Sequence, residues 1–161
     1  NQLSHTNITK GKNMKKILLM FLLSISIYAA QYRVIYNLQS GDEGKVTSSI
    51  IKGIPQLQEH YKSQGDNLKV VIIISNKSYK FFIKELKNSS DIVLDAMLQE
   101  RVATKIQKLA QSGVRFEICS MGMKKHNIAK EILYDYVHPA FNRTASLIKW
   151  QNKGYSIVDV L

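Results

Sequence analysis

The sequence predicts a single α/β domain, built on one doubly wound, mainly parallel sheet of four or five strands with helices on both faces. Residues 68–74 form a nearly unbroken run of β-branched side chains, which is typical of a strand buried on both faces of a parallel sheet. Such strand-like runs alternate with helical patterns of about 10 to 20 residues, as βαβ units do. Right-handed crossovers then place helices on both faces of the sheet.

The N-terminal part of the chain has the pattern of a secretory signal peptide. A short basic segment at Met14 precedes an apolar stretch at 17–28 and two small residues, Ala29 and Ala30. The apolar stretch is shorter than the roughly 20 residues of a membrane span, although an uncleaved anchor stays an alternative. We therefore expect a periplasmic or secreted protein with no stable membrane span after cleavage. The predicted divisions are an upstream extension at 1–13, a signal peptide at 14–30 and an α/β domain at 31–161.

Hydrophobic periodicity and turn residues predict the elements of the domain in order. Pro55 interrupts one helical pattern, Gly113 ends another, and Pro139 closes a short strand. The predicted strands lie at 31–38, 68–74, 114–119, 136–138 and 155–161. The predicted helices lie at 45–62, after Ser75 and Asn76, and at 92–111, 120–126 and 140–152.

The same periodicity predicts which side chains face the core. The aromatic set Tyr79, Phe81 and Phe82 is expected in the core, with a contact between subunits as the alternative. The helical positions expected to face inward are Val46, Ile50 and Ile54, then Val93, Met97, Val102, Ile106 and Leu109, and finally Ala145, Leu147, Ile148 and Trp150.

Cys119 is the only cysteine of the chain and the leading candidate for chemistry. It ends a predicted buried strand, and open α/β sheets bind their ligands at the carboxyl ends of strands. The helix predicted to follow and the nearby Lys124 and Lys125 favour a thiolate, which is the nucleophilic form of the side chain. The alternative is a packing cysteine, because free cysteine is among the most buried residue types.

Other residues are candidates to surround this thiol. The backbone N–H groups of Ser120, Met121 and Gly122 are expected to stabilise an anion. The loop that begins at Gly41 leaves the same edge of the sheet. His126 and His138 could approach Cys119 in space and act as acid, base or anion partners.

Composition and spacing argue against several other classes of site. The formal net charge is +11, but its lysines and arginines are spread along the chain. We therefore expect a solvated basic surface and no nucleic-acid partner, with affinity for small anions left open. His60, His126 and His138 are too scattered for a metal motif, so no metal and no cofactor are predicted. A metal module using Cys119 and two histidines stays a third alternative.

The assembled segments resemble the DsrE/DsrF-like family of small α/β proteins associated with sulfur relay. The resemblance rests on residues 32–38, 68–74, 113–119 and 145–155, the third of which ends in Cys119. Many relatives carry His-Gly after the second strand, where this chain has Ser75 and Asn76, and we count these two as binding candidates. Many relatives also carry Asn where this chain has Met121.

The resemblance implies that Cys119 accepts, carries or transfers sulfane sulfur as a persulfide, as a sulfur carrier or a sulfurtransferase. It also implies a homo-oligomer, such as a trimer or hexamer, and a thiol-bearing protein as sulfur acceptor. The alternative is a non-enzymatic module that binds a small anion or a partner, or serves in assembly, with Cys119 as a structural residue.

Overall fold

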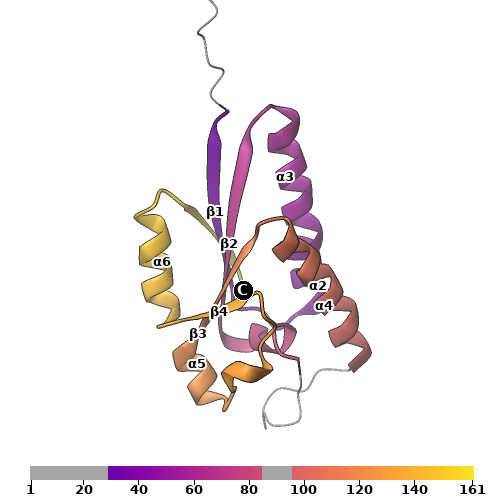
Figure 1. The fold of residues 1–161 in the computed structure, drawn as a ribbon, viewed down its shortest axis with the longest axis vertical. Helices are drawn as coiled ribbons and strands as arrows, with labels where there is room; N and C mark the ends of the chain where they lie inside the picture. The colour runs from indigo at the N-terminus through magenta and orange to yellow at the C-terminus, as the bar shows by residue number, and fades with distance from the viewer. Residues whose placement is uncertain (1–28, 85–95) are drawn as a thin grey trace, which may run out of the picture.

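The computed structural model describes residues 29–84 and 96–161, which form a single parallel sheet with helices on both faces (Figure 1). All strand pairs of the described chain are parallel, and the strand order is β4-β3-β2-β1-β5. The strands are β1 (Gln31–Leu38), β2 (Asn67–Ile74), β3 (Arg115–Cys119), β4 (Val137–Ala140) and β5 (Ser156–Val160). The predicted fold class is therefore confirmed, and β1 has the predicted bounds.

The helices form two layers. Figure 1 shows α3 and α4 on one side of the sheet and α6 on the other. The helical elements are α2 (Glu43–Lys45), η1 (Val46–Lys52), α3 (Gly53–Ser63), η2 (Asn76–Phe81), α4 (Ala96–Gln111), α5 (Ser120–Lys125), η3 (Lys130–Ile132) and α6 (Arg143–Gln151). No helix among the described residues is long and apolar enough to cross a bilayer.

Alternation along the strands creates a large core and a small core. In β2, Ile72 and Ile74 point into the large core beneath α3 and α4, whereas Val71 and Ile73 point into the small core. Leu147 and Trp150 of α6 cover the small core. The central strands are thus buried on both faces, as their continuous apolar runs predict.

The helical segment after β1 contains one wide turn before Pro55. Residues 43–63 are helical throughout, but η1 has π-helical geometry. The Gly53 N–H donates to the carbonyls of both Ile50 and Ser48. Pro55 lacks an N–H and cannot continue the regular series of backbone hydrogen bonds. The π-helical turn just before it accommodates this loss, so the helical segment continues past Pro55.

Several predicted boundaries and side-chain positions need correction. Pro139 lies within β4 rather than after it, and it is tolerated because β4 is an edge strand that leaves one side unpaired. The last helix begins at Arg143, since the Asn142 side chain caps it by accepting from the Ala145 N–H. Ala145 and Ile148 are exposed, and Ser146 is the buried position of α6.

The long central helix is confirmed where the structure describes it. Val102, Ile106 and Leu109 of α4 are buried as predicted, and Gly113 follows the helix with φ of +90°. The predicted start at residue 92 and the side chains of Val93 and Met97 lie outside the described residues. So do the upstream extension and most of the predicted signal peptide, residues 1–28.

Candidate functional site

The connections that follow β3 and β4 lead to opposite faces of the sheet. The segment after β3 packs Met123 and Ile128 into the large core, whereas the segment after β4 leads into α6 on the opposite face. Cys119 ends β3 and pairs with Ala140, which ends β4. Adjacent strands whose connections diverge in this way form the topological switch point, where open α/β sheets bind ligands. Cys119 therefore lies at the position that the topology favours for a site.

The side chain of Tyr79 is hydrogen-bonded to Cys119. Its hydroxyl donates to the Cys119 carbonyl over 3.1 Å, although the two residues are 40 positions apart. Burial raises the pKa of the Tyr79 hydroxyl far above its usual range, and the neighbouring Cys119 side chain raises it further through its charge and a hydrogen bond. The phenol therefore stays protonated, and its single hydrogen can turn from the Cys119 carbonyl to a sulfur anion on the same residue. Cys119 itself is only 9% exposed.

Gly122 makes the approach of Tyr79 possible. A Cβ at this position would overlap the Tyr79 hydroxyl oxygen and lie 2.6 Å from Cζ of the same ring. The His126 ring packs against Tyr79, with the two ring centroids 5.6 Å apart. The buried Nδ1 of His126 has no hydrogen-bond partner among the described residues. Two of the predicted binding residues, Gly122 and His126, therefore contact Tyr79, which in turn is hydrogen-bonded to Cys119.

Ser75 directly follows β2, the strand that pairs with the one that Cys119 ends. Ile74 pairs with Ile118, and Ser75 and Cys119 are the next residues along the two segments. Ser75 is 3% exposed, and its Oγ has no hydrogen-bond partner within the described part of the chain. A buried hydroxyl without a hydrogen-bond partner is uncommon, which makes Ser75 a candidate to bond a group held at Cys119.

The outer rim of the site is apolar and basic. Met121 and Phe141 are 57% and 75% exposed, on the two segments that diverge from β3 and β4. The Asn142 amide donates to the Met121 sulfur over 3.7 Å and so joins these segments. Lys124 and Lys125 are exposed at the end of α5. They add positive potential near the site without touching Cys119.

A family model for the DsrE/DsrF-like family matches residues 11–160. The chain belongs to the DsrE/DsrF-like family. The match spans every strand and helix of the described domain, so the resemblance seen in four segments of the sequence is confirmed over the whole fold.

A solved structure supports the fold of this DsrE-like chain. The protein of unknown function MTH1491 from Methanobacterium thermoautotrophicum is similar, with a TM-score of 0.61 and 16% sequence identity. The similarity covers 80% of this chain and 98% of that one. No match was found among curated proteins. At this level of identity the likeness concerns the fold alone.

Three of the predicted binding residues are not brought to the thiol of this DsrE-like protein. The register places His138 beside Glu117, two residues short of the end of β3. Asn76 is exposed, and its amide donates to Gln39 Oε1 over 2.7 Å. Gly41 closes against Lys77, since a Cβ there would lie 2.8 Å from the lysine Cβ. These positions shape the loops at the edge of the sheet rather than the surroundings of Cys119.

Glu117 forms a buried polar centre that the sequence reasoning missed. It is 2% exposed, two residues before Cys119, on the face covered by α6. Its carboxylate accepts hydrogen bonds from Ser146, Lys149, Trp150 and Arg115 at 2.7–3.0 Å. Burial alone would raise the pKa of Glu117, but these four donors outweigh it and hold the pKa at about 2. The ionised carboxylate ties α6 to β3. The sequence signal that could have revealed this centre is the charged Glu117 within an otherwise apolar strand.

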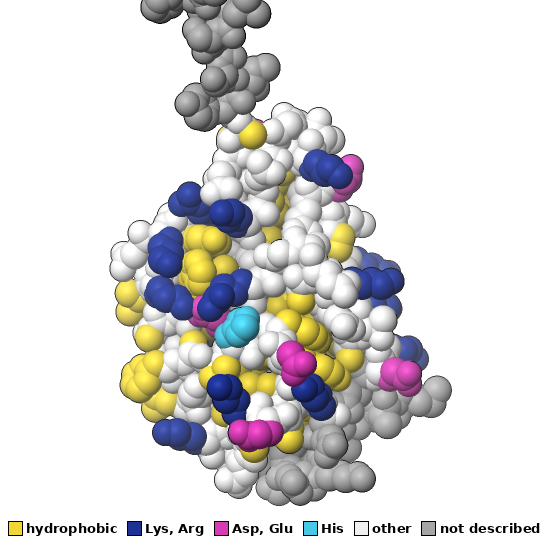
Figure 2. Space-filling model, viewed as in Figure 1, with side chains coloured by type: hydrophobic (Ala, Val, Ile, Leu, Met, Phe, Trp, Pro, Cys, Tyr) yellow, Lys and Arg dark blue, Asp and Glu magenta, His cyan; other side chains and the backbone are white. Residues whose placement is uncertain are grey.

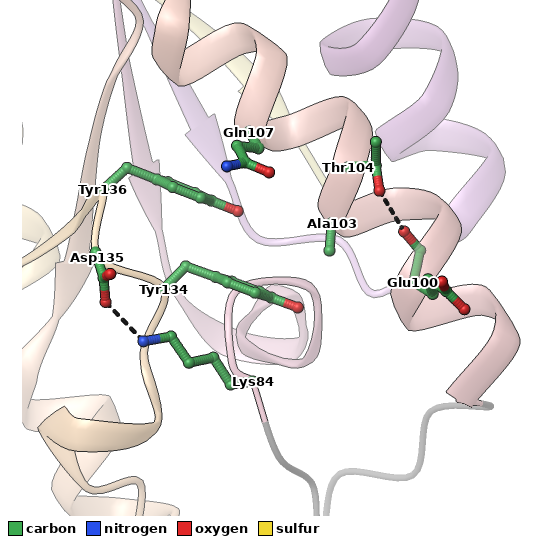
Figure 3. A pocket seen from close by; sticks show the side chains of 8 residues that line it. All are labelled: Lys84, Glu100, Ala103, Thr104, Gln107, Tyr134, Asp135 and Tyr136. Atoms are coloured by element: carbon green, nitrogen blue, oxygen red, sulfur yellow. Dashed lines mark hydrogen bonds and ion pairs between the residues drawn. The ribbon is translucent and has the colours of Figure 1, made fainter.

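A separate hollow lies between α4 and the segment that leads into β4. Its volume is about 410 Å³, and Figure 3 shows Tyr134 and Tyr136 pointing across it toward α4, with Gln107 opposite. The two rings stack with centroids 5.4 Å apart, and Lys84 bonds Asp135 over 2.6 Å at the rim. No predicted site residue lines this hollow, so it is distinct from the surroundings of Cys119.

The aromatic prediction is confirmed, and the metal alternative gains no support. Tyr79, Phe81 and Phe82 are each at most 1% exposed, so they form core rather than a subunit contact. Trp150 is half-buried and hydrogen-bonded to Glu117. Within residues 29–84 and 96–161 no group of three metal-ligating side chains comes together.

The Tyr79→Phe variant tests the contact at the thiol. A hydrogen bond to a charged group contributes about 1.5–3 kcal/mol, so losing the hydroxyl should slow alkylation of Cys119 about tenfold at neutral pH. Intact-mass measurement of iodoacetamide modification checks this. Tyr136→Phe is the matched control, because its buried hydroxyl has no partner among the described residues. Equal rates in the two variants would remove Tyr79 from the site.

Proposed function

We propose that this DsrE-like protein handles sulfane sulfur by carrying it as a persulfide on Cys119. The family suggests sulfur-relay chemistry in general. The observation that carries the finer proposal is the Tyr79 hydroxyl beside Cys119, which is a permanent donor held in place by the absence of a side chain at Gly122. A donor of this kind stabilises negative charge on sulfur in a site shielded from water.

Loading is a thiol–disulfide type of exchange. The Cys119 thiolate attacks the outer sulfur of a donor persulfide and forms a new S–S bond. The S–S bond of the donor breaks, and its electron pair leaves on the donor thiolate. In this proposal the outer sulfur on Cys119 is then an anion, which the Tyr79 hydroxyl, the Ser75 hydroxyl and the N–H groups at the start of α5 stabilise.

Unloading runs through the same bond. The thiolate of an acceptor protein attacks the outer sulfur, and the Cys119 thiolate leaves with the electron pair. The exposed Met121 and Phe141 give an acceptor an apolar surface next to the thiol. Neither step requires an external oxidant or reductant, since each S–S bond formed replaces one broken.

The alternative is a binding or assembly module in which Cys119 only packs. The observation in its favour is the low exposure of the thiol, 9%, together with its membership of the large core. The exposed apolar rim would then serve contact with another protein chain. Thiol reactivity separates the two functions.

Export and self-assembly are part of the proposal. The basic segment and apolar stretch at 14–28 support delivery to the periplasm or outside the cell. The family resemblance supports a homo-oligomer such as a trimer or hexamer. Sedimentation of the purified chain measures the assembly, and a monomer at high concentration would contradict it.

The sulfur proposal is tested by loading the chain directly. We expect incubation with an organic persulfide or polysulfide to add the mass of one sulfur atom to the intact protein. The Cys119→Ser variant should gain none, and the adduct should disappear when a small thiol acceptor is added. A chain that gains no sulfur while its fold is intact would contradict the carrier role.

A further inference from the structure

Three cations converge on the single tryptophan of the chain, away from Cys119. The Nζ atoms of Lys149 and Lys153 each lie 4.8 Å from the Trp150 ring centroid, and Arg115 Cζ lies 5.7 Å from it. Each contact is within the range of a cation–π interaction. The two ammonium groups are therefore within about 10 Å of each other, which is comparable to the Debye length at 0.1 M salt.

Two more cations extend this cluster across the sheet. Arg33 donates from Nη1 to the Lys153 carbonyl over 2.7 Å, and Lys69 stands beside Arg33 in the register of β1 and β2. We name the surface formed by Arg33, Lys69, Arg115, Lys149, Trp150 and Lys153 the Trp150 face.

The Trp150 face carries excess positive charge. Glu117 pairs with Arg115 and Lys149, but it is buried beneath them. Among the described residues no carboxylate lies within ion-pair distance of Arg33, Lys69 or Lys153. In Figure 2 lysine and arginine side chains ring a hydrophobic patch above the histidine in the centre of the view. Like charges gathered around an aromatic ring repel one another unless an anion lies over them.

The surroundings of the face indicate which anion this is. In a chain that keeps the apolar stretch at 17–28 as an uncleaved anchor, that stretch ends five residues before Arg33, so Arg33 stays within about 18 Å of the bilayer. Tryptophan and clustered lysine and arginine are the residues that favour the headgroup region of anionic membranes. A basic surface around a half-buried indole suits the phosphate groups of lipid headgroups.

We propose that the Trp150 face docks on the anionic phosphate headgroups of a lipid bilayer. Docking leaves the rim of Cys119, at the opposite end of α6, open to a partner. The inference does not depend on sulfur chemistry, because it uses none of the residues around the thiol.

The intrinsic fluorescence of Trp150 tests this on the full chain, since no other tryptophan is present. We expect vesicles that contain phosphatidylglycerol to shift the emission to shorter wavelength, and vesicles of phosphatidylcholine alone to leave it unchanged. The shift should weaken as salt is added. Binding through the N-terminal stretch alone would leave the emission unchanged with both kinds of vesicle and would overturn the proposal.

Paired charge variants locate the contact. Each basic residue near an anionic surface strengthens binding about fivefold, so Lys69→Gln with Lys153→Gln should weaken vesicle affinity roughly 25-fold. Lys105→Gln with Lys108→Gln removes the same charge from exposed positions on α4, across the sheet, and should change affinity less than about twofold. Equal losses of vesicle affinity in both double variants would overturn the proposal, because binding would then depend on net charge alone and not on the Trp150 face.

Two further probes separate the possible sources of anion. Inorganic phosphate at millimolar concentration should not reproduce the emission shift, and a short DNA oligonucleotide should bind more weakly than the anionic vesicles. A shift with phosphate alone would assign the face to a free anion, and tighter binding of the oligonucleotide would assign it to nucleic acid. Either result would overturn docking on lipid.

Discussion

Replacing Gly122 by alanine should cost about 2 to 3 kcal/mol of stability and remove most of the reactivity of Cys119. The new Cβ would overlap the Tyr79 hydroxyl oxygen and lie 2.6 Å from Cζ. Tyr79 is 1% exposed and has no free space to move into, so either α5 or the tyrosine must shift. Each shift breaks the hydrogen bond from Tyr79 to the Cys119 carbonyl.

Urea unfolding and iodoacetamide kinetics measure the two parts of this prediction. Gly44→Ala is the matched control, because its Cβ would meet only the Asp42 carboxylate, 3.0 Å from the Oδ1 atom that accepts from the Lys45 N–H, and no aromatic ring. We expect its stability to change by less than about 1 kcal/mol and its alkylation rate to stay the same. If Gly122→Ala behaved like this control, the close packing of Tyr79 against α5 would be wrong.

Glu117→Gln should destabilise the domain by about 3 kcal/mol at neutral pH. The folded chain holds the Glu117 pKa at about 2, against an ordinary value of 4.5, and each pKa unit corresponds to about 1.4 kcal/mol. The carboxylate is 2% exposed, so solvent screens it little. An amide keeps the shape but removes the charge that binds Lys149 and Arg115.

The pH dependence gives the sign of the effect. A carboxylate whose pKa is depressed by folding stabilises the folded state fully above its unfolded value of about 4.5. That contribution is lost as the pH falls through about 2. The wild-type chain should therefore lose about 3 kcal/mol over this window because of Glu117, whereas Glu117→Gln should lack this part of the slope.

Asp135→Asn is the control for the charge change. Asp135 also pairs with a lysine, Lys84 at 2.6 Å, but its side chain is 94% exposed. Exposed ion pairs contribute at most about 1 kcal/mol, so this variant should unfold almost like the wild type at every pH. Equal losses in Glu117→Gln and Asp135→Asn would contradict the view that burial makes the Glu117 centre strong.

The strands and the position of Cys119 could be predicted from the sequence because they depend on local patterns. A continuous β-branched run such as that in β2 has few alternatives to a buried parallel strand, and a cysteine after such a run falls at the carboxyl edge. Pro139 was misplaced because edge position in a sheet is a property of topology. A pattern of single residues does not contain that property.

The surroundings of Cys119 could not be predicted in the same way, because they depend on contacts between distant segments. The hydrogen bond from Tyr79 spans 40 residues, and Ser146 bonds Glu117 across 29. His138 was expected near the thiol, but the β3–β4 register places it beside Glu117. A difference of two residues in register moves a side chain by about 7 Å along a strand, which decides whether it reaches the site.

The rate of alkylation of Cys119 at slightly acidic pH tests the central claim most directly. If Tyr79 and the start of α5 stabilise a sulfur anion, iodoacetamide should modify the folded chain at least about tenfold faster at pH 6 than the same chain unfolded in urea, after correction for urea itself. Both rates come from intact mass, with the single cysteine as the only thiol. A folded chain that reacts more slowly than the unfolded chain would contradict the account and leave Cys119 as a packing residue.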